Sequence, residues 1–137
     1  MPDLERFIEP QSSVYSKVLA ELRAGRKESH WIWFVFPQLK GLGSSAMAQR
    51  YGIAGRAEAE AYLHHPILGP RLRECTELVL AIDGRRIEDI FAYPDNLKFR
   101  SSMTLFAQVG SEHEPFARAL DKYFNGEPDP MTLQLLT

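Results

Sequence analysis

The sequence predicts an all-α fold, and two observations support this prediction. Apolar residues recur at helical spacing along most of the 137 residues, and glycine or proline interrupts each stretch. No segment shows the alternation of polar and apolar residues that is typical of a half-buried strand. We therefore expect a single compact domain over residues 1–137, built from about seven or eight short helices.

Capping residues and helix breakers indicate where the expected helices begin and end. The clearest helix opens at Pro70, because proline is favoured in a first helical turn, and closes at Gly84. Its apolar face contains Leu72, Cys75, Val79 and Ile82. Further helices are expected over 12–25, 44–51, 58–63, 87–91, 95–108, 111–126 and 129–136. The expected side-chain caps of four of them are Ser44 or Ser45, Asp95 or Asn96, Ser111 with Glu114, and Asp129.

The apolar run from Trp31 to Phe36 is the exception to this helical pattern. It is rich in aromatic residues and is bounded by Pro37, features that also fit a buried strand. A lone strand would have no partner for its backbone hydrogen bonds, because no other segment has a strand pattern. We therefore expect a buried helical turn or an extended core segment here.

The composition excludes several function classes. The net charge of −2 gives no global electrostatic support for general nucleic-acid binding or for binding to an anionic membrane surface. No apolar stretch approaches the roughly 20 residues that span a bilayer, and the first residues lack the pattern of a signal peptide. The single cysteine, Cys75, fits a reducing compartment. We expect a cytoplasmic protein without a membrane span, and we leave its oligomeric state open.

No motif in the chain indicates a metal or a cofactor. His64 and His65 are adjacent, so their side chains point apart on a helix, and no acidic or cysteine partner stands at ligand spacing. The 41–45 turn, Gly-Leu-Gly-Ser-Ser, is neither a P-loop nor a dinucleotide fingerprint, since no strand precedes it. Its backbone amides could cradle a phosphate, but a tight turn with helix caps is the favoured interpretation.

Two segments mix reactive polar residues with large apolar ones. The first reads SHWIWFVFPQ at 29–38, and the second reads PDNLKFRSSMTLF at 94–106. Ordinary core elements separate these residue types by face, so the mixture favours a functional site. We expect the two segments to form one pocket.

These segments resemble the bacterial family called domain of unknown function 1810. The family's pattern is similar to SHWMWFIFPQ and GLG.S, followed by AYL.HP.LG.RL.E and PDDLKL.SSMTLF. The matching residues here are 29–38, 41–45, 61–74 and 94–106, so the resemblance covers nearly the whole chain. It implies a compact, mostly helical domain, in agreement with the prediction from spacing. It implies no established activity.

Members of this family are often labelled calpastatin, the name of a calpain inhibitor. Such inhibitors are similar to long, disordered repeats rich in lysine and glutamate, which this chain lacks, so we do not transfer that activity. The chain departs from the family pattern at Asn96, where a second aspartate is usual. This change favours a structural role at position 96, because asparagine can still cap a helix.

Polar residues of the second segment are candidates for ligand binding. Lys98, Ser101 and Ser102 lie at i, i+3 and i+4, so a helix would place all three on one face. A lysine beside two hydroxyl groups can bind an anion. Arg100 adds positive charge, although it projects toward another face. The alternative interpretation is a capped first turn with an exposed lysine.

His30 and Asp95 are the candidate catalytic residues. A histidine beside an apolar wall is suited to general acid–base catalysis, whereas the alternative is a structural histidine bonded to a carbonyl group. In a glycosidic-bond hydrolase, Asp95 would stabilise an oxocarbenium-like state. Trp31, Trp33 and Gln38 complete the candidate ligand-binding set. The two tryptophans point in different directions on a helix, so at most one is expected to line a pocket.

Together these residues favour a small phosphorylated or nucleotide-like ligand, because they combine cationic donors, an aromatic stacking surface and amide groups. One alternative is a hydrolase of the glycosidic bond in an ADP-ribose-like compound, by analogy with other helical domains. Another is a non-catalytic interaction domain, whose signature would be an exposed aromatic patch. A third is that both segments are structural and lock the core through a buried polar network. The sequence does not decide whether the protein is an enzyme.

Overall fold

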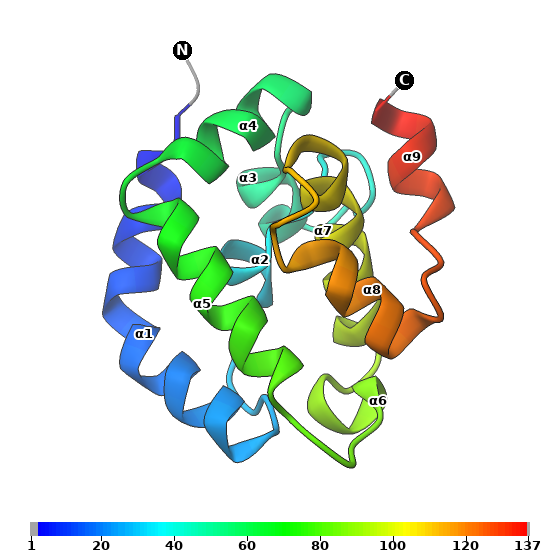
Figure 1. Ribbon diagram of the computed structural model, residues 1–137. Helices are drawn as coiled ribbons and strands as arrows, with labels where there is room; N and C mark the ends of the chain where they lie inside the picture. The colour runs from blue at the N-terminus through cyan, green and yellow to red at the C-terminus, as the bar shows by residue number, and fades with distance from the viewer. Residues whose placement is uncertain (1–2, 137) are drawn as a thin grey trace.

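The all-α prediction is confirmed by the computed structural model, which describes residues 3–136 (Figure 1). Within that range the chain forms nine helices, and its only β-type pairing is an isolated parallel bridge between Leu39 and Ile53. The helices are α1 (Glu5–Ala24), α2 (Ile32–Val35), α3 (Ala46–Tyr51), α4 (Arg56–His64), α5 (Leu68–Leu80), α6 (Ile87–Ile90), α7 (Asp95–Val109), α8 (Phe116–Phe124) and α9 (Pro130–Leu136). Eight of them correspond to the predicted ranges, and the ninth is the single turn α2. The first two residues, part of the segment expected to lack a signal peptide, lie outside the described range.

The apolar run from Trp31 to Phe36 contains the helical turn α2 (Ile32–Val35), the first of the two alternatives that the sequence left open. Figure 1 places α2 near the middle of the molecule. The backbone N–H of Phe36 closes the turn by donating to the carbonyl of Ile32 at 3.0 Å. This internal bond removes the need for a neighbouring strand, which the buried backbone would otherwise require.

Helix α1 begins at Glu5, earlier than the predicted start near Ser12. Phe7 and Gln11 are both buried, so the first turns of the helix pack against the core. Pro10 lies within the helix. Tertiary packing therefore outweighs the local preference for ending a helix at proline.

Helix α5 ends at Leu80, before the predicted stop at Gly84. The Lys122 ammonium of α8 donates to the carbonyl oxygens of Leu80 at 2.6 Å and Ile82 at 2.7 Å. These bonds satisfy carbonyl groups that the end of a helix leaves without partners. A side chain distant in the sequence thus helps to fix where α5 ends.

Two of the four predicted caps are confirmed and two are wrong. The Ser45 hydroxyl accepts a hydrogen bond from the N–H of Ala48 (3.1 Å), and Asp129 accepts one from the N–H of Thr132 (3.2 Å). Neither Asp95 nor Asn96 caps α7, which has no side-chain cap. Instead, the Asp95 carboxylate binds a lysine of another segment, described below. The predicted box of Ser111 and Glu114 also fails, because the Glu114 carboxylate binds the Arg73 guanidinium at 2.8 Å.

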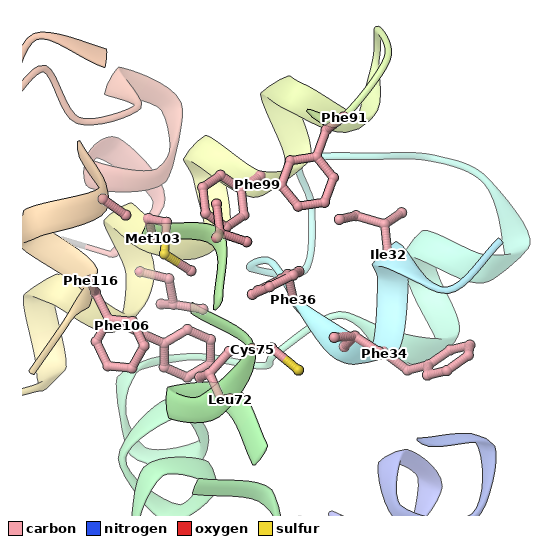
Figure 2. Packing of buried hydrophobic residues seen from close by; sticks show 14 of the residues in the cluster. Ile32, Phe34, Phe36, Leu72, Cys75, Phe91, Phe99, Met103, Phe106 and Phe116 are labelled. Atoms are coloured by element: carbon pink, nitrogen blue, oxygen red, sulfur yellow. The ribbon is translucent and has the colours of Figure 1, made fainter. Parts of the chain in front are cut away.

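The core is aromatic and gathers around α7. The Phe99 ring centroid lies 4.8 Å from that of Phe91 and 5.0 Å from that of Phe36, and all three rings are buried. Figure 2 shows these rings between Ile32 on one side and Met103 on the other. Helix α7 contacts α2, α4, α6, α8 and α9. The two unusual segments are therefore neighbours in space, held together by the central core.

Candidate functional site

Glu21 of α1 organises the start of the first segment. Its buried carboxylate accepts hydrogen bonds from the backbone N–H groups of Glu28 (2.7 Å) and Ser29 (3.0 Å). It also accepts from the Ser29 hydroxyl (2.6 Å) and the Trp31 indole N–H (3.0 Å). Burial alone raises the pKa of Glu21, but these four hydrogen bonds outweigh it and lower the pKa to about 2. The polar groups that open the segment thus stabilise a buried charge.

Sequence reasoning missed Glu21, although a signal was present. Glu21 lies three residues after Val18 and next to Leu22, on the buried face of α1. An acidic residue within an apolar stripe needs hydrogen-bond donors from elsewhere in the fold. The sequence does not show which residues supply them.

The structure places Trp31 and His30 in contrasting surroundings. The Trp31 side chain is only 1% exposed, and its ring packs near Phe36 and Phe91. His30 is exposed, and its imidazole has no hydrogen-bond partner among the described residues. Neither side chain lines the cleft described next, so their positions give no support to the predicted roles in ligand binding and catalysis.

A cleft of about 450 Å³ lies where the end of the first segment meets the start of the second. The first segment contributes Gln38, and α7 contributes Leu97, Lys98 and Ser101. The turn before α3 and the start of α9 complete the lining. With Pro94, which precedes α7, five residues of the two segments are therefore brought together around one recess.

Lys98 is the basic residue of the cleft lining. Its Nζ atom lies 4.9 Å from the ring centroid of Trp33 and 3.7 Å from Oδ1 of Asp95. The other oxygen of that carboxylate, Oδ2, accepts a hydrogen bond from Nζ of Lys27 at 2.6 Å. The Lys27 side chain is only 6% exposed. One carboxylate therefore lies between two ammonium groups and compensates the positive charge of Lys98 only in part.

The half-buried Trp33 supports Lys98 without lining the cleft itself. Its indole ring provides the aromatic face for the cation–π contact with the ammonium group. Its buried Nε1 atom has no hydrogen-bond partner in the described part of the chain. The predicted role of Trp33 as a stacking surface thus becomes a contact with lysine in this structure.

The serines of α7 do not share one environment. The Ser101 hydroxyl lies 3.1 Å from the Leu97 carbonyl oxygen and 3.0 Å from Oδ2 of Asp129, at the cleft. Ser102 is fully buried, and its hydroxyl has no partner within residues 3–136. Adjacent helical residues differ by about 100° in direction, so a narrow cleft reaches only one of them. The prediction that Lys98, Ser101 and Ser102 act on one face is therefore not supported for Ser102.

Arg100 projects away from the cleft, as expected. Its guanidinium donates to the carbonyl oxygens of Glu127 at 3.0 Å and Pro128 at 3.1 Å. These bonds hold the connection between α8 and α9. Arg100 therefore positions the segment that leads to the cleft, and it does not line the cleft.

Asp129 is a cleft residue that sequence analysis identified only as a helix cap. Its Oδ2 atom accepts from the Thr132 hydroxyl (2.6 Å) and the Thr132 N–H (3.2 Å), in addition to its contact with Ser101. These donors disperse the negative charge on that oxygen. Because α9 and the second segment are far apart in sequence, no local pattern predicts that Asp129 joins this site.

The cleft offers several donors and an apolar rim. The side chains of Gln38 and Ser44 make no hydrogen bond to the rest of the described chain, so both are free to bind a ligand. Ser44 lies in the turn where sequence analysis considered a phosphate cradle. Leu97 and Met131, 45% and 54% exposed, add apolar surface. The arrangement suits a ligand with an anionic group and an apolar or aromatic part.

Residues 3–136 offer neither a group of metal ligands nor a membrane-spanning helix. This range contains no group of three histidine, cysteine, aspartate or glutamate residues that could hold a metal ion. No helix in it is long and apolar enough to cross a membrane.

Comparison with known proteins identifies relatives without an assigned activity. The family model described as "Protein of unknown function (DUF1810)" matches residues 1–136. The crystal structure of the conserved hypothetical protein Rv1873 from Mycobacterium tuberculosis is similar, with a TM-score of 0.96 and 57% sequence identity. The match covers 98% of this chain and 96% of that protein. No protein with a curated description matches the chain.

Proposed function

Because the chain belongs to the DUF1810 family of unknown function, we propose from its own geometry that it binds a small phosphorylated or nucleotide-like ligand in the cleft between α3, α7 and α9. The observation that carries this proposal is the position of Lys98. Its ammonium group faces a cleft, rests on an aromatic ring, and shares its carboxylate partner with a second lysine. A lysine held in this way keeps attraction for an external anion.

The other cleft groups fit the same class of ligand. The Gln38 amide and the Ser44 hydroxyl can donate to phosphate oxygens beside Lys98. The carboxylate of Asp129 would repel an anion, but its Oδ2 atom already accepts hydrogen bonds from three donors, which reduce this repulsion. Its other oxygen, Oδ1, can accept a hydrogen bond from a sugar hydroxyl. The proposed ligand therefore has its phosphate near Lys98 and its hydroxyl groups near Asp129.

The size and the rim of the cleft support a small molecule. Ligand pockets commonly occupy about 300–1,000 Å³, and this cleft falls within that range at about 450 Å³. The exposed side chains of Leu97 and Met131 can contact the flat face of a base. A free, buried Cys75 is in keeping with a cytoplasmic location, which stays a prediction.

We do not propose the glycosidic-bond hydrolase as a second function. Asp95, its main candidate, does not line the cleft, and Lys27 already binds its carboxylate at 2.6 Å. The interaction-domain hypothesis predicted exposed aromatic residues in the first segment, but Trp31 and Phe36 are buried. No specific contact favours either alternative.

The proposal is tested by thermal-shift measurements with nucleotides, NAD, ADP-ribose and sugar phosphates. A ligand that binds only the folded state raises the melting temperature, and the rise increases with the logarithm of the ligand concentration above its Kd. We expect at least one phosphorylated compound to stabilise the wild type and to lose most of its effect in Lys98→Gln. The matched control is Lys17→Gln, which removes an exposed lysine of α1 outside the cleft. An equal response in both variants, or no response to any compound, would contradict the proposal.

A further inference from the structure

A second and larger cavity lies at the N-terminal end of α4. Its volume is about 730 Å³, and it shares no lining residue with the cleft. Four basic residues and two acidic residues line it, in a protein whose net charge is −2. The cavity is therefore a local region of positive charge on an acidic protein.

Arg6 and Glu58 both line this cavity, and they form an ion pair with each other. The Arg6 guanidinium binds the Glu58 carboxylate at 2.9 Å, and the N–H of Ala54 donates to the same carboxylate at 3.0 Å. Arg6 also donates to the carbonyl oxygens of Arg50 (3.0 Å) and Gly52 (2.9 Å). Its donors are thus occupied by the protein, and they hold the 50–54 loop in place.

The other three cations of the cavity are Lys40, Arg50 and Arg56. None of them forms an ion pair with a carboxylate of the described residues. Arg56 donates to the carbonyl oxygen of Gln108 at 3.1 Å, and Arg50 lies over the ring of Tyr51. Neither contact compensates a positive charge.

The fold brings these cations together through close backbone packing. The N–H of Lys40 donates to the carbonyl of Ile53 at 2.8 Å, and the N–H of Ile53 donates to the backbone carbonyl of Gln38 at 2.9 Å. A side chain at Gly52 would come within 2.8 Å of the Lys40 backbone. Only glycine permits this approach, so the position of Lys40 beside the 50–54 loop depends on it.

We propose that this cavity binds a phosphate-type oxyanion, as the phosphate group of a small molecule. Lys40, Arg50 and Arg56 supply charge that has no acidic partner in residues 3–136, and the cavity gives the anion a recessed position. Glu58 in the first turn of α4 already offsets the positive end of that helix dipole, so the attraction for an anion comes from the three side-chain cations. The site is separate from the cleft and does not depend on the function proposed there.

The test is a titration of ¹⁵N-labelled protein with inorganic phosphate, compared with chloride at the same ionic strength. We expect saturable shifts of the amide signals of Lys40, Arg56 and Ala57. The signals of Ser44 and Ser45 report on the cleft and serve as an internal comparison. Shifts that do not saturate, or that chloride reproduces, would overturn the proposal.

Two variants connect the response to the cations. Replacing both Lys40→Gln and Arg50→Gln should weaken phosphate binding at least about tenfold, whereas Lys17→Gln should leave it unchanged. The melting temperature of each variant shows whether it is folded. The bonds from Arg6 to the carbonyl oxygens of Arg50 and Gly52 involve neither substituted side chain, so they should persist in the double variant. Unchanged binding in the folded double variant would refute the assignment of this site, without bearing on the cleft.

Discussion

Two polar clusters of this protein look alike in sequence and differ in what they do. Around Glu21, a buried carboxylate receives four hydrogen bonds, one from Glu28 and three from the start of the first segment. Around Lys98, one carboxylate is shared by two lysines, and neighbouring donors face a cleft. The first cluster is satisfied internally, whereas the second faces a cleft where we propose that a ligand binds. A polar residue among apolar ones therefore indicates a binding site only when the fold leaves its donors or charge unused.

The largest expected effect concerns the internal cluster. Glu21→Gln replaces the charged acceptor of four hydrogen bonds, so we expect the free energy of unfolding to fall by about 3 kcal/mol. Chemical denaturation of the variant and the wild type measures this difference. Glu60→Gln, on the exposed face of α4, is the matched control and should change stability by less than about 0.5 kcal/mol. Equal effects of the two substitutions would show that Glu21 is not a structural centre.

Acid should weaken the same cluster in a defined pH range. The pKa of Glu21 falls from an ordinary value of 4.5 to about 2 on folding, so its contribution is complete above pH 4.5. The contribution is lost as the pH falls from 4.5 toward 2, and we expect about 2 kcal/mol of it to be lost by pH 3. Denaturation at pH 7 and pH 3 tests this. The free energy of unfolding of Glu21→Gln should change less between these pH values than that of the wild type. An identical change in both proteins would exclude Glu21 as its source.

The two tryptophans offer a direct comparison between the clusters. Trp31→Phe removes an indole N–H that binds Glu21, and we expect a loss of about 2 kcal/mol in stability. Trp33→Phe removes an N–H that has no partner among the described residues, so about 1 kcal/mol or less is expected. Ligand binding should show the opposite order, because Trp33 supports Lys98. Denaturation measures the order of the two stability losses, and binding measurements give the order of the two affinity losses. A larger stability loss in Trp33→Phe than in Trp31→Phe would contradict this account.

The smallest expected effect is at His30. Its exposed side chain contacts neither cluster within the described chain, so His30→Ala should change stability by less than about 0.5 kcal/mol. Ligand affinity should also be unchanged, because His30 does not line the cleft. A large loss of binding in this variant would restore His30 as a functional residue and require a different site.

Local sequence patterns predicted most of the helices but not all of their ends. The periodic apolar face of α5 is a property of the residues themselves, and most of that helix forms where the pattern placed it. Helix α7 has no such face, because residues 101–106 are all buried, yet it closely follows the predicted range. The start of α1 depends on burial of Phe7, and the end of α5 depends on Lys122. Such contacts join residues that are distant in sequence, so no local pattern contains them.

The same limit applies to the candidate site. Lys98, Ser101 and Gln38 were predicted from their segments, and the structure brings them to one cleft. The sequence offers Asp95 both as a cap and as a catalytic candidate, because its partner, Lys27, lies outside both segments. Trp31 was a ligand candidate because nothing local indicated the bond to Glu21. Sequence patterns identified reactive residues, and the tertiary contacts separated internal partners from free ones.

The most direct test of this account is a titration of ¹⁵N-labelled protein with the phosphorylated compound that raises its melting temperature most, followed through the two indole N–H signals. The chain contains two tryptophans, one in each cluster, so each cluster has its own reporter. We predict a saturable shift of the Trp33 signal, together with the amides of Ser44 and Leu97, while the Trp31 signal stays in place. A shift of Trp31 without Trp33, or no saturable shift of either, would contradict the assignment of the cleft as the ligand site.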